Sequence, residues 1–100
     1  MSINTSDETE ISPLNLAITK GNERIVSFLL SSPNIDINLV SRHKNGENKT
    51  PLILAVENQN HSIIQLLLND PRIDVNLEVD GKTAFQVAVR KGYTEIVKIL

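Results

Sequence analysis

The sequence contains no cysteine and no tryptophan, and it has only one tyrosine and two phenylalanines. Without cysteine, the chain forms no disulfide and offers no thiolate for catalysis or metal binding. A core with so few aromatic residues must be filled by aliphatic and small side chains, which suits thin, stacked helical layers that contact only their neighbours. The shortage of aromatic side chains also leaves few stacking platforms for single-stranded nucleic acid.

Long apolar runs and a strong net charge are missing as well. No stretch approaches the ~20 apolar residues of a membrane-spanning helix, and the first ten residues are polar and acidic, unlike a signal peptide. The formal net charge of −2 is too small to indicate a nucleic-acid or membrane partner. These absences predict a protein that works in a cytosol, with neither nucleic acid nor membrane as partner.

The residues of common catalytic and metal sites are also sparse. The only two histidines, His43 and His61, stand apart in the sequence and belong to no Ser-His-Asp arrangement or cluster of metal ligands. No glycine-rich loop is present that could hold a phosphate. The sequence therefore predicts no catalytic residues, no metal site and no cofactor, so the chain is not expected to be an enzyme.

The sequence does contain an internal repeat. Three similar openings, Ser12-Pro13-Leu14, Thr50-Pro51-Leu52 and Thr83-Ala84-Phe85, begin 38 and 33 residues apart. A period between about 20 and 50 residues is typical of stacked repeat arrays. With its T-P-L opening at this period, the chain resembles the ankyrin-repeat family from residue 12 to residue 100.

The resemblance implies an all-α fold: a solenoid of stacked helix–turn–helix pairs with β-hairpin-like finger loops. Residues 1–11 would form a lead-in, followed by repeats at about 12–49, 50–82 and 83–100. The first repeat would lack its leading hairpin, and the last would end in its outer helix. Because no polar capping repeat follows, we expect a fragment of a longer array, or else an end covered by another copy.

Helix starts can be placed from local signals. Ser12 and Thr50 are suited to N-caps, each followed by proline at the first helical position, and Thr83 with Gln86 forms a capping-box pattern. Apolar spacing then predicts inner helices from Pro13 to Lys20, from Pro51 to near Asn58 and after Thr83. The outer helices are expected at about 23–31, 61–68 and 94–100.

The connections between helices give mixed signals. Gln59 stands where the other repeats have Gly21 and Gly92, and glutamine suits a left-handed helix terminus poorly, so this turn is expected to fray or to take another path. Residues 35–38 and 73–76 alternate in polarity and predict extended entries to hairpins.

Aspartate and asparagine recur in these two segments. Asp36 and Asp74 repeat in register, which favours a structural role in a turn over paired acid–base chemistry. Asn38 and Asn76 are expected to stabilise the same turns. The family resemblance also implies that this asparagine can be hydroxylated.

The loop between the first two repeats is unusually long. Asn38 and Thr50 are 12 positions apart, while Asn76 and Thr83 are 7 apart. Asn45-Gly46 is a strong hairpin-turn signal and predicts the tip of this loop. The insertion is either a tolerated surface loop, since added length costs little entropy, or an extended finger that contacts a partner.

The resemblance implies that partners dock on a concave face, formed by the finger loops and the exposed ends of the inner helices. Basic residues outnumber acidic ones there by seven to four when Glu47 and Glu78 are included, although the whole chain is acidic. This favours an acidic protein or peptide partner, the alternative being an ordinary surface of mixed charge. Carried over to this sequence, the predicted partner-binding residues are Thr19, Lys20, Arg42, His43, Lys44, Lys49, Glu57, Asn58, Asp80, Lys82, Arg90 and Lys91.

The main functional hypothesis is a protein–protein interaction module that binds through the concave face and the inserted finger loop. One alternative is a targeting or regulatory arm of a larger multidomain enzyme, whose catalytic part lies outside this chain. The abundance of isoleucine, asparagine and lysine indicates an AT-rich genome, so a host-directed effector of an intracellular microbe, acting in the host cytosol, is a further alternative. A monomer is expected, with self-association through the uncapped C-terminal end as the other hypothesis.

Overall fold

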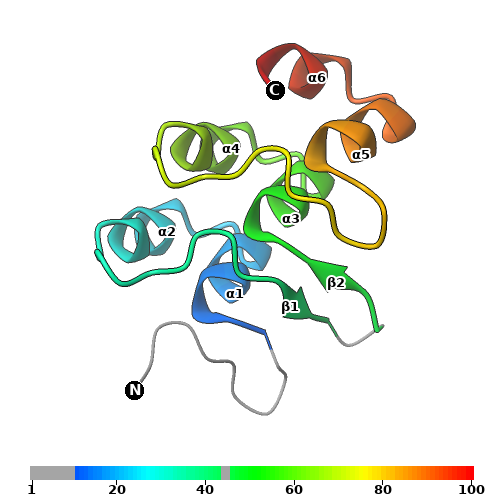
Figure 1. Cartoon of the computed structure of the whole chain (residues 1–100). Coiled ribbons are helices and arrows are strands. Elements are labelled where there is room, and N and C mark those ends of the chain that lie inside the picture. The colour runs from blue at the N-terminus through cyan, green and yellow to red at the C-terminus, as the bar shows by residue number, and fades with distance from the viewer. Residues whose placement is uncertain (1–10, 44–45) are drawn as a thin grey trace.

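The computed structural model describes residues 11–43 and 46–100. Three helix pairs stack in chain order, with α1, α3 and α5 in one row and α2, α4 and α6 in a second row (Figure 1). The all-α solenoid predicted from the sequence is confirmed. The pairs are α1 (Pro13–Thr19) with α2 (Glu23–Leu30), α3 (Pro51–Glu57) with α4 (His61–Leu68), and α5 (Ala84–Lys91) with α6 (Thr94–Ile99).

The inner helices begin as predicted. The side chains of Ser12 and Thr50 accept hydrogen bonds from the third helical backbone N–H, and proline follows each of them. Thr83 and Gln86 form a complete capping box. The outer helices α2 and α4 are capped in the same way by Asn22 and Asn60, which the sequence analysis did not identify. Side-chain caps therefore fix the starts of five of the six described helices.

The turn after α3 does not fray, so this prediction was wrong. Gln59 itself adopts the left-handed conformation, with φ of 54°, as Gly21 and Gly92 do at the equivalent places. The chain then closes the turn in the usual way, because the Asn60 N–H donates to the Ala55 carbonyl at 3.2 Å. Tertiary packing of α3 and α4 overrides the local preference of glutamine, at a cost of about 1–2 kcal/mol.

The segments after the outer helices turn, whereas extended structure was predicted. The Asp36 side chain accepts a hydrogen bond from the Asn38 backbone N–H at 3.0 Å, and Asp74 accepts one from the Asn76 N–H at 3.0 Å. Such bonds from an aspartate to the backbone two residues on define a local turn. The structural role predicted for both aspartates is confirmed.

The long loop between the first and second helix pairs forms a short hairpin. Strand β1 (Ser41–Arg42) pairs antiparallel with β2 (Asn48–Lys49). The His43 N–H donates to the Glu47 carbonyl at 2.8 Å, and Gly46 has φ of 85°. Gly46 thus lies at the predicted turn, whereas Asn45 of the predicted tip lies outside the described residues.

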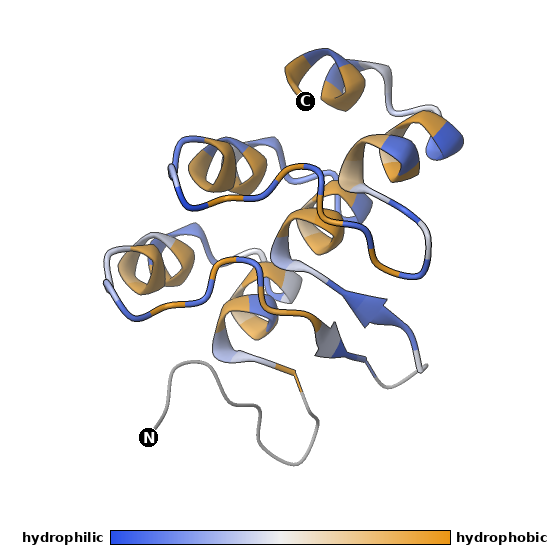
Figure 2. Ribbon diagram, in the orientation of Figure 1, coloured by the Kyte–Doolittle hydropathy of each residue, from blue (hydrophilic) through white to orange (hydrophobic). Residues whose placement is uncertain are grey.

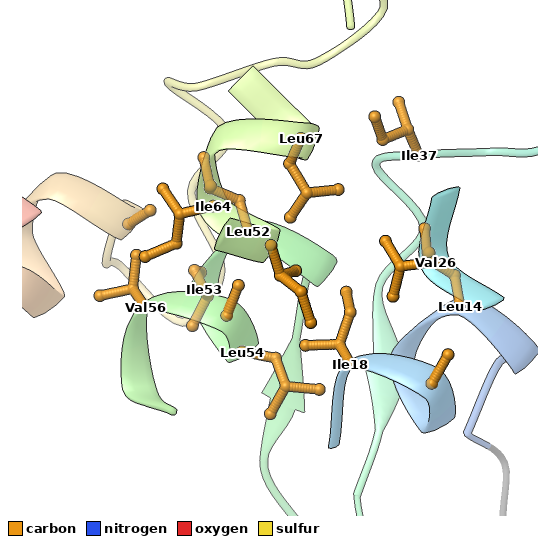
Figure 3. Packing of buried hydrophobic residues seen from close by; sticks show 14 of the residues in the cluster. Leu14, Ile18, Val26, Ile37, Leu52, Ile53, Leu54, Val56, Ile64 and Leu67 are labelled. Atoms are coloured by element: carbon orange, nitrogen blue, oxygen red, sulfur yellow. The ribbon is translucent and has the colours of Figure 1, made fainter. Parts of the chain in front are cut away.

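The core is one continuous aliphatic cluster that runs through all three helix pairs. In Figure 3, Ile18 of α1 and Leu54 of α3 point toward one another, while Val56 points to the other side of α3, toward α5. Figure 2 shows the hydrophobic residues concentrated within the helices and hydrophilic residues along β2 and at the end of α5.

No helix of the described residues is long and apolar enough to cross a membrane.

Candidate partner-binding site

The hairpin is fixed against the start of α1. The Ser12 backbone N–H donates to the Ser41 hydroxyl at 3.1 Å, and the Asn15 side-chain amide donates to the Lys49 carbonyl at 3.2 Å. Ser12, Asn15 and Ser41 are all buried, so these bonds lie away from competing water. The finger loop is thereby held by polar contacts to the preceding helix pair.

Two predicted contact residues, Lys49 and Glu57, form an ion pair. The Lys49 ammonium lies 2.5 Å from the Glu57 carboxylate and 3.4 Å from that of Glu47. The Lys49 and Glu57 side chains are only 16% and 23% exposed. Burial acts to lower the pKa of Lys49, but its hydrogen bond and charge interaction with Glu57, aided by Glu47, outweigh burial and raise that pKa. Lys49 therefore joins the hairpin to α3 and presents little of its charge to a partner.

A small cavity of about 30 Å³ lies between the hairpin and the turn at residues 79–82, which precedes α5. This turn is closed by two backbone hydrogen bonds between Val79 and Lys82, and Asp80 and Gly81 both adopt positive φ at its tip. The structure thus brings together five residues of the predicted contact face: Glu47, Lys49, Glu57, Asp80 and Lys82 line the cavity.

His43 is half-buried and lies close enough to Lys49, Glu57 and Glu47 to interact with their charges. Its Nε2 atom is buried without a hydrogen-bond partner among the described residues. Burial lowers the pKa of His43, the Lys49 charge lowers it further, and the Glu57 and Glu47 carboxylates oppose both effects. His43 is therefore held in the neutral form, and its imidazole contributes no positive charge to the face near neutral pH.

This environment predicts a pH-dependent stability. As pH falls through the ordinary value of 6.5, the unfolded chain protonates His43 more readily than the folded chain does, so the free energy of unfolding decreases as the pH is lowered. A His43→Gln variant should show a shallower decrease in urea unfolding series between pH 7.5 and 5. Equal slopes for the variant and the parent chain would contradict this origin of the effect.

The other predicted contact residues differ in their availability. Thr19 donates its hydroxyl to the Asn15 carbonyl at 2.9 Å, and Asn58 donates its side-chain amide to the Ile18 carbonyl at 3.4 Å, so both bind within the fold. Lys44 lies outside the described residues. The remaining four basic residues are exposed at helix ends and on the hairpin: Lys20, Arg42, Arg90 and Lys91.

Sequence reasoning missed a polar link between the first two helix pairs, made by Arg72. The Arg72 guanidinium donates to the Leu30 carbonyl at 2.7 Å and the Ser32 carbonyl at 2.9 Å, which lie at the end of α2. The Asp70 carboxylate accepts two hydrogen bonds from the Arg72 guanidinium and one from the Arg72 backbone N–H, and this hydrogen bonding lowers the pKa of Asp70. The link joins residues about forty positions apart, and only the repeat period could have suggested that they meet.

Among residues 11–43 and 46–100, no group of three or more His, Cys, Asp or Glu side chains is placed to hold a metal ion. A family model described as ankyrin repeats matches residues 14–100 in three copies. The chain therefore belongs to the ankyrin-repeat family, as the sequence predicted. Proteins of this family are generally protein-interaction modules and typically non-catalytic. A search of curated proteins finds no match to this chain.

Proposed function

We propose that this chain is a non-catalytic interaction module of the cytosol that binds an acidic protein or peptide through its concave face. The observation that carries the proposal is the charge that remains after the internal ion pairs are formed. Lys49 pairs with both Glu47 and Glu57, and these three residues together keep one negative charge. Five basic residues of this face then have no ion pair with another described residue, against two such acidic residues, Glu78 and Asp80. The five are Lys20, Arg42, Lys82, Arg90 and Lys91.

The construction of the fold supports this use of the surface. The hairpin is pinned by Ser12, Asn15 and the Lys49–Glu57 pair, so its backbone is positioned before a partner arrives. A contact loop that is already ordered loses less conformational entropy on binding. The exposed basic side chains then set partner choice and association rate through long-range attraction.

A matched pair of variants tests the proposal. Arg90→Gln with Lys91→Gln removes two charges from the end of α5, whereas Arg24→Gln with Lys98→Gln removes two from the outer helices. All four side chains are exposed, so both variants should fold like the parent chain, which circular dichroism would verify. Both variants also have the same net charge.

We expect the α5 variant alone to lose partners captured from cytosolic lysate and identified by mass spectrometry. Binding of a synthetic glutamate-rich peptide should weaken at least about fivefold for this variant, which corresponds to roughly 1 kcal/mol. The outer-helix variant should retain the partners and the peptide affinity. Equal losses for the two variants, or no loss for either, would contradict a specific basic contact face.

A further inference from the structure

Three hydroxyl residues of the sequence are followed directly by proline, and they differ in exposure. Ser12 and Thr50 are helix N-caps that are only 2% and 5% exposed, and their side chains bond to the helix backbone. Ser32 follows the end of α2 and is only partly buried, and Pro33 beside it is exposed. An enzyme that recognises serine or threonine before proline can therefore reach the hydroxyl of Ser32 without opening a helix start.

The equivalent position one repeat later carries a carboxylate. Asp70 stands 38 positions after Ser32 and is likewise followed by a proline, Pro71. The Ser32 hydroxyl accepts from the Asn34 backbone N–H at 3.3 Å, just as the Asp70 carboxylate accepts from the Arg72 N–H at 2.9 Å. Asp70 belongs to the central repeat, with a helix pair on each side, and it too is only partly buried. Partial exposure is therefore a property of this turn in the repeat, and the turn accommodates a negative charge.

A cation is already placed beside Ser32. The Arg72 guanidinium donates from Nη1 to the Ser32 carbonyl at 2.9 Å and from Nη2 to the Leu30 carbonyl at 2.7 Å. Its Nε and Nη2 atoms also donate to the Asp70 carboxylate, at 2.9 and 2.7 Å. A guanidinium has five N–H groups, and the fifth, on Nη1, bonds to no described residue. The nitrogen that contacts Ser32 therefore has one donor left.

We propose that Ser32 is a phosphorylation site for a protein kinase that recognises serine followed by proline, and that its phosphate binds Arg72. In this reaction Ser32 Oγ forms a bond to the γ-phosphorus of ATP, and the bond from that phosphorus to the bridging oxygen breaks to release ADP. The hydroxyl proton passes to a carboxylate of the kinase. The site lies where the first two helix pairs are joined and goes beyond the proposed function, which uses the concave face.

The charges around Ser32 favour this pairing. A phosphoserine brings a charge of about −1.5 to −2 at pH 7 and three strong acceptor oxygens, and the planar N–H groups of arginine match phosphate well. The Asp70 carboxylate and the carbonyls at the end of α2 oppose a further negative charge. Asp70, however, binds Nε and Nη2 of Arg72, whereas Ser32 lies at Nη1, so phosphate and carboxylate would bind different parts of one cation.

Phosphorylation of the intact, folded chain tests the site. The chain is incubated with ATP and a purified kinase selective for serine or threonine before proline, and the phosphate is located by mass spectrometry. We expect phosphate on Ser32 and none on Ser12 or Thr50, which are buried caps. Ser32→Ala should abolish the incorporation. Absence of phosphate from Ser32, or equally fast incorporation at Ser12 or Thr50, would overturn the proposal.

Titration of the phosphate, followed by phosphorus NMR, tests its contact with Arg72. The second pKa of phosphoserine is ordinarily about 6, and a neighbouring guanidinium lowers it because it favours the dianion. The titration midpoint of the phosphorylated parent chain should be at least about half a pH unit below that of phosphorylated Arg72→Gln. Arg24→Gln is the matched control, since it removes an arginine near the start of α2, and it should leave the midpoint unchanged.

Because Arg72 also bonds to the end of α2, circular dichroism must show that Arg72→Gln folds. If it does not fold, the phosphorylated parent chain is titrated both folded and unfolded in urea, and the midpoint of the folded chain should be the lower one. Equal midpoints in the comparison that is made would overturn the pairing of the phosphate with Arg72.

Discussion

Replacement of Ile63 by alanine should lower the free energy of unfolding by about 2–5 kcal/mol, the range for deleting a buried isoleucine side chain. Ile63 is fully buried in α4, the outer helix of the central pair. Two neighbouring pairs enclose this helix pair, so the surroundings have little freedom to collapse into the space left by the deleted atoms. Urea unfolding followed by circular dichroism would measure the loss.

The chain supplies a matched control for this change. Ile25 occupies the equivalent position in α2 but is 47% exposed. Ile25→Ala therefore removes the same atoms from a side chain that buries much less apolar surface. We expect a change of about 1 kcal/mol or less. Equal losses at the two positions would contradict the order of stacking.

Much of the fold was predictable because its signals are local. Ser12 and Thr50 cap helices through bonds to residues three positions ahead, and Thr83 pairs with Gln86 within a single turn. The repeat period then assembles these units, since a helix pair with one apolar side must pack against a copy of itself. Fold class followed from these two kinds of information.

The conformation of Gln59 could not be predicted from its local sequence. Its left-handed conformation contradicts its intrinsic preference, and packing on both sides of the turn decides the outcome. The turns at Asp36 and Asp74 were misjudged for a related reason. Alternating polarity indicated extended chain there, but the aspartate side chains bond to the backbone and favour a turn.

For the predicted partner-binding residues, the sequence did not show how their charges would pair within the fold. Lys49 and Glu57 were both expected to meet a partner, and sequence could not show that they would meet one another across eight positions. The burial of His43 was likewise not predictable from the sequence, because it depends on how the hairpin folds back toward α3. Ion pairs between elements depend on side-chain directions, which the repeat pattern does not specify.

The second large effect is expected at Asn38, which joins the first and second helix pairs. Its side-chain amide donates to the Arg72 carbonyl at 2.9 Å, and its side-chain oxygen accepts from the Asp74 N–H at 2.8 Å. Asn38→Ala removes both bonds and leaves two backbone groups without partners. With about 0.5–1.5 kcal/mol for each bond, the free energy of unfolding should fall by about 1–3 kcal/mol.

Asn76 provides the comparison, because it stands at the equivalent position one repeat later. Its side chain is exposed and makes no hydrogen bond recorded among residues 11–43 and 46–100, so Asn76→Ala should change stability by about 0.5 kcal/mol or less. Asn38→Asp keeps the acceptor for Asp74 but places a carboxylate against the Arg72 carbonyl, so we expect a loss at least as large as that of alanine. If Asn38→Ala and Asn76→Ala have equal effects in urea unfolding, the asparagine acts only within its own turn. A larger effect at Asn38 would instead establish it as a clamp between successive helix pairs.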